Sequence, residues 1–233
     1  MLRLHEVIGQ QLQQPTGLAG AAIALGMSLV NREPNRIAIE ALDVASDDTV
    51  LELGFGPGRA IAALTAIARD GMVLGIDHSA DMIRHASWLN RKAIQKGRAE
   101  LRQGCFDWLP WPAESIDKIL AVNVVYFFGH DGAEIREARR VLRRGGTMVI
   151  YATEKAATAR FNFSKTHRFF DQNGIAELIM RGGFAANEVA VRPITLAFGI
   201  SGLLAKAKKD TSLSFPMQPV DATVLEPPLR CVP

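Results

Sequence analysis

A short apolar run that leads directly into a glycine-rich loop constrains this chain most. Residues 50–53 read Val-Leu-Glu-Leu, glycines follow at positions 54, 56 and 58, and a helical pattern begins at Arg59. Glycine has no Cβ, so it adopts left-handed backbone angles easily and lets backbone amides approach a ligand closely. A strand, a glycine loop and a helix in this order predict an α/β unit that holds a nucleoside-type cofactor.

A carboxylate at the end of the next strand-like run narrows the type of cofactor. Asp77 lies 19 residues after Gly58, at the end of the run 72–76, where it can accept both hydroxyls of a ribose. The dinucleotide fingerprint would place a third small residue where Arg59 stands. Glu52 would repel a pyrophosphate but would attract the ammonium group of an amino acid. The pattern therefore favours a cofactor that combines a ribose with an amino-acid end.

Two later segments complete the pattern, namely Gly104-Cys105-Phe106-Asp107-Trp108-Leu109-Pro110-Trp111-Pro112 and Ala121-Val122-Asn123-Val124-Val125-Tyr126-Phe127-Phe128. With the glycine loop and the Gly75-Ile76-Asp77 strand end, they stand in the order and spacing of a known family. The chain resembles the small-molecule branch of the class I S-adenosylmethionine-dependent methyltransferases. The second segment lacks the double proline of the amine-directed nucleic-acid methyltransferases, so the resemblance disfavours nucleic-acid amines as substrates.

The resemblance implies S-adenosylmethionine as cofactor and a set of residues that hold it. Phe106 would contact the adenine through its backbone, and Asn123 would lie at the sulfonium end. Cys105 stands where the family commonly has aspartate, and Asp107 can take over the adenine amine. The expected cofactor-binding residues are Glu52, Gly54, Gly56, Gly58, Asp77, His78, Cys105, Phe106, Asp107 and Asn123.

The chemistry implied is direct displacement of a methyl group, in which the protein mainly aligns acceptor, methyl and sulfur. A base is needed only where the acceptor carries a proton. Tyr126 and His130 are the candidate catalytic residues, and no metal is expected. The aromatic residues Phe161 and Phe163, with His167, are expected to close an acceptor pocket. Neither the acceptor nor the oligomeric state can be predicted from the sequence.

Strand-like runs alternate with helical patterns between Thr49 and Thr153, which predicts a doubly wound α/β fold. We expect a mostly parallel seven-stranded sheet with helices on both faces, a Rossmann-like methyltransferase fold. The expected strands are 49–53, 72–77, 99–103, 116–123, 147–153, 187–194 and a last run reaching Lys209. The division expected along the chain is a helical cap (1–45), the cofactor-binding domain (46–210) and a proline-rich, unstructured tail (211–233).

Several helix boundaries are also predicted. Ser79 is expected to cap one helix that continues to Lys96, with Met82, Ala86, Leu89 and Ala93 on one face. Asp131 and Glu134 suggest a capping box for the next helix, which ends in the basic and glycine residues 143–146. Further helices are expected over 34–42 and 171–181.

Composition limits the remaining possibilities. The chain has 233 residues and a net charge of only +3, which does not require a nucleic-acid partner. Its two cysteines are too few for a disulfide framework. The apolar run 17–30 is shorter than the roughly twenty residues that span a bilayer. A cytoplasmic enzyme with a small-molecule acceptor is the leading interpretation. A phospholipid-amine methyltransferase at a membrane surface and a non-catalytic cofactor-binding protein remain the alternatives.

Overall fold

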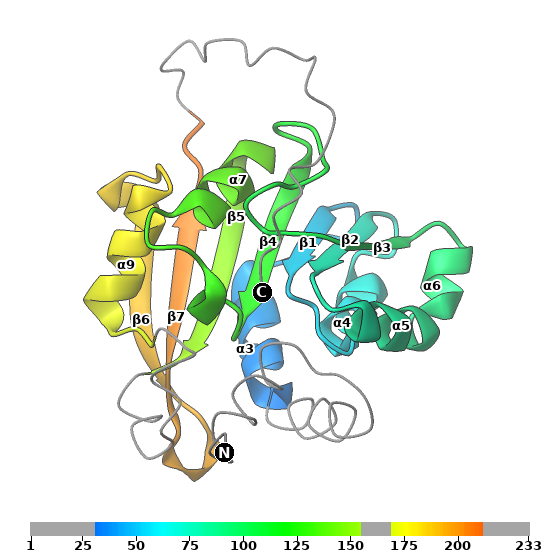
Figure 1. Ribbon diagram of the computed structural model, residues 1–233, viewed down its shortest axis with the longest axis horizontal. Helices are drawn as coiled ribbons and strands as arrows, with labels where there is room; N and C mark the ends of the chain where they lie inside the picture. The colour runs from blue at the N-terminus through cyan, green and yellow to red at the C-terminus, as the bar shows by residue number, and fades with distance from the viewer. Residues whose placement is uncertain (1–30, 155–168, 212–233) are drawn as a thin grey trace, which may run out of the picture.

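The structure is a computed structural model, and it describes residues 31–154 and 169–211 (Figure 1). Three features predicted above lie outside these ranges: the apolar run 17–30, the residues Phe161, Phe163 and His167, and the tail from residue 212. The described part of the expected cap is one helix, α3 (Arg32–Leu42).

Within the described residues, seven strands form one sheet in the order β3-β2-β1-β4-β5-β7-β6. The first five pair in parallel, and β7 runs antiparallel to both β5 and β6. The expected Rossmann-like architecture with a mostly parallel sheet is thus confirmed. The antiparallel pairing is found at the side of the sheet formed by β7 and β6. The strands are β1 (Thr49–Leu53), β2 (Met72–Asp77), β3 (Ala99–Gln103), β4 (Ile116–Val122), β5 (Leu142–Thr153), β6 (Val189–Thr195) and β7 (Ser201–Lys208).

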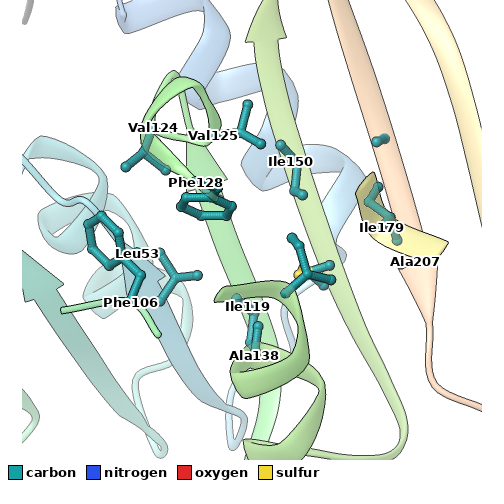
Figure 2. Close-up of a cluster of buried hydrophobic side chains, with 14 of the residues drawn as sticks. Leu53, Phe106, Ile119, Val124, Val125, Phe128, Ala138, Ile150, Ile179 and Ala207 are labelled. Carbon is teal, nitrogen blue, oxygen red and sulfur yellow. The ribbon is translucent and has the colours of Figure 1, made fainter. Parts of the chain in front are cut away.

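Helices cover both faces of the sheet, because the central strands are apolar on both sides. On one face α3, α4 (Arg59–Ile67) and α5 (Ala80–Leu89) pack over a core that includes Val50 and Leu120. On the other face α7 (Ala133–Val141) and α9 (Gln172–Arg181) cover a second core. Figure 2 shows part of this second core, in which Ala138 of α7 lies near Ile119 of β4, and Ile179 of α9 lies near Ala207 of β7.

The prediction of one continuous helix from Ser79 to Lys96 is wrong, because the helix is interrupted at Asn90. Ser79 does cap α5, but the helix ends at Leu89, and a short helix α6 (Arg91–Gln95) follows. The side chain of Asn90 is buried between the two helices and donates hydrogen bonds to the carbonyls of Gly58 and Ala86. Leu89, expected on the buried face, is exposed.

The start and the end of α7 also differ from the prediction. Gly132 caps the helix in a left-handed conformation, and a Cβ there would lie 2.9 Å from the backbone nitrogen of Gly182 beyond α9. Glu134 instead accepts a hydrogen bond from the backbone N–H of Gly129. Residues 143–146 belong to β5, since Gly145 and Gly146 exchange backbone hydrogen bonds with Lys209. Tertiary contacts therefore set both boundaries.

Parallel pairing brings the carboxyl ends of β1, β2, β4 and β5 to one edge of the sheet. In open α/β sheets this edge is where ligands bind. The candidate site residues within the described ranges follow one of these strands or β3, apart from Glu52 inside β1 and Asp77, the last residue of β2.

Candidate cofactor and acceptor site

The three glycines of the loop have left-handed backbone angles but different surroundings. A Cβ at Gly54 would lie 2.5 Å from the Val124 side chain, and one at Gly58 would lie 2.6 Å from Ala86. A Cβ at Gly56 would meet no atom of residues 31–154 and 169–211 within 4 Å. Gly54 and Gly58 therefore allow close packing against Val124 and α5, whereas no described residue fills the space beside Gly56 at the sheet edge.

Asp77 joins the end of β2 to this loop. One carboxylate oxygen accepts a hydrogen bond from the Gly56 N–H at 2.9 Å, and the other accepts one from the Ser79 N–H at 2.9 Å. Burial raises the pKa of Asp77, while these two N–H groups lower it. Each carboxylate oxygen can accept a further hydrogen bond, so the carboxylate can serve a ligand while it holds the loop.

Glu52 lies inside β1, opposite Gly75 of β2 and Leu120 of β4, and only 3% of it is exposed. Burial raises the pKa of Glu52 well above its usual range, and the nearby Asp77 carboxylate adds to the rise. The backbone N–H of Ile61, in the first turn of α4, opposes it. One carboxylate oxygen, Oε2, has no hydrogen-bond partner among the described residues.

The loop after β3 lies beside the end of β2. The carbonyl of His78 accepts a hydrogen bond from Gln103, and the His78 ring meets the Phe106 ring edge-on at a centroid distance of 6.0 Å. The Phe106 ring is buried in the core (Figure 2), which leaves its backbone as the group that can reach a ligand. Cys105 is half-buried and Asp107 is exposed.

The end of β4 carries a hydrogen-bonded cluster around Asn123, which has a left-handed φ of 53°. Its Oδ1 accepts hydrogen bonds from the Tyr126 hydroxyl at 2.7 Å and from the backbone N–H of Thr153 at 3.1 Å. Its amide nitrogen donates to the side chain of Asn31, the residue before α3, at 2.7 Å. The cluster thus joins the ends of β4 and β5 to the start of the N-terminal helix.

The structure separates the two residues predicted to be catalytic. Tyr126 is buried in the Asn123 cluster, and burial raises its pKa above the usual value, which favours a role as hydrogen-bond donor over that of a base. His130 is exposed, and its carbonyl accepts a hydrogen bond from Arg181 of α9. His130 and α9 line a cavity of about 250 Å³. Phe169 also lines this cavity, and its ring centroid lies 5.3 Å from that of Tyr126.

Two members of the Asn123 cluster escaped prediction from the sequence. Asn31 and Thr153 stand 92 and 30 residues from Asn123. Thr153 ends a strand at the ligand-binding edge, which is a signal that the sequence contained. No sequence pattern pointed to Asn31.

Comparison with known proteins agrees with this geometry. A family model described as a methyltransferase domain matches residues 50–146, which contain the glycine loop, Asp77 and Asn123. The chain is 31% identical over 133 residues to an uncharacterized methyltransferase, YdaC, of Bacillus subtilis, covering 57% of this chain and 71% of the relative. The chain belongs to the class I S-adenosylmethionine-dependent methyltransferases. Members of this family generally use S-adenosylmethionine.

Two further comparisons concern a relative and the fold. The chain is 35% identical over 103 residues to a trans-aconitate 2-methyltransferase of Azoarcus sp., covering 44% of this chain and 38% of that protein. It spans 48%, 61% and 63% of the lengths of three other relatives. A structure of a Haloferax volcanii methyltransferase complexed with the Trm112 activator shares the fold. Its TM-score is 0.67 at 20% identity, over 80% of this chain and 93% of that one.

Among residues 31–154 and 169–211, no helix combines the length and the apolar character needed to cross a membrane. The same part of the chain contains no group of three or more metal-ligating side chains.

Proposed function

We propose that this methyltransferase transfers the methyl group of S-adenosylmethionine to a small-molecule acceptor at the carboxyl edge of the sheet. The observation that carries the proposal is the open space at Gly56, bordered by the Asp77 carboxylate that holds the same loop. A ligand that rests against the Gly56 backbone meets an acceptor for its hydroxyl groups in the Asp77 carboxylate, which is hydrogen-bonded to the Gly56 N–H.

The proposed cofactor contacts follow the order of the strands. Asp77 accepts the ribose hydroxyls, and Glu52 lies toward the ammonium of the methionine end. The backbone of Phe106 contacts the adenine, with Cys105, Asp107 and His78 beside it. Asn123, at the end of β4, lies at the sulfonium end. With these contacts, we expect the methyl group near the carboxyl ends of β4 and β5.

The acceptor is proposed to bind between this junction and the aromatic rings beyond it. Tyr126 and Phe169 form a tilted ring pair, and Phe127 meets Tyr126 edge-on at 6.3 Å. Such rings suit an apolar or cationic molecule better than a phosphate-rich one. Tyr126 positions the acceptor and keeps its proton, and His130 can contact the part of an acceptor that extends toward α9. The name of the Azoarcus relative, trans-aconitate 2-methyltransferase, supports a small organic acceptor.

Methyl-labelled S-adenosylmethionine tests the proposal directly. The full chain is incubated separately with a low-molecular-weight cell extract, phosphatidylethanolamine vesicles and transfer RNA, and each fraction is counted. We expect label in the small-molecule fraction with the wild type and a strong decrease with Asp77→Asn. Label confined to the vesicles would support the phospholipid-amine alternative, and label confined to RNA would contradict the proposal.

A further inference from the structure

Glu52 combines three features that the fold itself does not require. It is an ionisable side chain inside a buried strand, and a second carboxyl group lies beside it. Within the part of the chain that the structure describes, one of its carboxylate oxygens has no hydrogen-bond partner. A buried carboxylate is stable only when it is paired or fully hydrogen-bonded. In the empty protein, Glu52 is therefore expected to keep its proton.

The neighbouring Asp77 binds a proton less readily than Glu52 does. Burial raises the pKa of Asp77 too, but both of its oxygens accept hydrogen bonds from backbone N–H groups, which oppose the rise, and the adjacent His78 also opposes it. Glu52 has only the Ile61 N–H from α4 to oppose its burial, while Leu120 faces it from β4. Arg59 of α4 is exposed. Of the two carboxyl groups, Glu52 is therefore the one whose charged form receives less stabilisation from backbone N–H groups.

The charge of the ligand changes during methyl transfer. The bond between sulfur and methyl carbon breaks, a bond between the methyl carbon and the acceptor forms, and sulfur keeps the electron pair as a neutral thioether. S-adenosylmethionine therefore carries one positive charge more than S-adenosylhomocysteine. A nearby positive charge favours the ionised form of a carboxyl group.

We propose that Glu52 distinguishes cofactor from product by charge: the ammonium group that both ligands carry favours the ionised form of Glu52, and the sulfonium of S-adenosylmethionine favours it further, so that more of the proton is released to solvent with S-adenosylmethionine than with S-adenosylhomocysteine. This inference rests on the proposed function, which places the cofactor over the glycine loop. Because binding and proton release are linked, the affinity for S-adenosylmethionine rises with pH where Glu52 is neutral in the empty protein. The rise is at most about tenfold per pH unit for one proton. The affinity for S-adenosylhomocysteine rises less.

Calorimetry of the full chain measures the protons directly. Each ligand is titrated at one pH in phosphate and in Tris buffer, whose different ionisation enthalpies reveal the number of protons released. The variants are Glu52→Gln and, as a matched control, Glu40→Gln, which removes an exposed carboxylate on α3. We expect wild type and Glu40→Gln to release more protons with S-adenosylmethionine than with S-adenosylhomocysteine, and Glu52→Gln to show no such difference.

The outcomes separate this inference from the proposed function. Equal proton release with both ligands in the wild type would overturn the role of Glu52, and that comparison needs no variant. A difference that persists in Glu52→Gln would also overturn it. Failure of the wild type to bind S-adenosylmethionine at all would instead overturn the proposed function.

Discussion

The Asp77 carboxylate accepts a hydrogen bond from the Gly56 backbone N–H at 2.9 Å, across 21 residues of sequence. This bond fixes the glycine loop against the end of β2 and leaves the Gly56 surface open. One residue thus shapes the loop and is proposed to bind the ribose. The two roles can be separated by substitution.

Asp77→Ala is expected to weaken S-adenosylmethionine binding by about ten- to hundredfold. Loss of a charged hydrogen-bond acceptor costs about 1.5–3 kcal/mol, which corresponds to that range of affinity. Asp77→Asn keeps one acceptor oxygen for the Gly56 N–H and should retain more of the fold's stability. Calorimetric affinities of both variants check the assignment, and an unchanged affinity in Asp77→Ala would contradict it.

Substitutions of two loop glycines should have opposite consequences. Gly56→Val places its side chain in open space, so the loss of stability should stay near the roughly 1–2 kcal/mol of left-handed strain, while cofactor binding is abolished. Gly58→Val would collide with Ala86 and Asn90 and should destabilise the fold itself. Urea unfolding and cofactor titration of both variants measure the contrast. Normal binding by Gly56→Val would show that the cofactor lies elsewhere.

The pH dependence of stability should identify the buried carboxyl group. Burial raises the pKa of Glu52 in the folded state, so the folded protein keeps a proton that the unfolded chain loses. The free energy of unfolding therefore falls as pH rises from the unfolded pKa of about 4.3 through the folded pKa. Glu52→Gln lacks this decrease, and its advantage over the wild type should grow with pH. Urea unfolding at several pH values checks the sign.

Tyr126→Phe is expected to act on positioning and not on proton transfer. It removes the hydroxyl that donates to Asn123, which should cost about 0.5–1.5 kcal/mol of stability. Because burial raises the pKa of Tyr126, the hydroxyl stays protonated at ordinary pH. The pH–rate profile of the variant should keep its shape while the rate falls. Loss of one limb of that profile would indicate a base.

The sequence by itself determined the fold class and the cofactor family. Its alternating patterns, the glycine loop and Asp77 depend on contacts between near neighbours in the chain, which leave a local signature. The strands of the parallel sheet were located within a few residues, although β5 begins five residues earlier than expected.

The tertiary structure alone decided which of these residues meet. The break at Asn90, the start of α7 at Gly132 and the early start of β5 all arise from contacts with distant segments. The same holds for the bond between Asn123 and Asn31, and for the unpartnered oxygen of Glu52. Burial and long-range hydrogen bonding depend on how strands and helices pack, and a local sequence pattern does not record them.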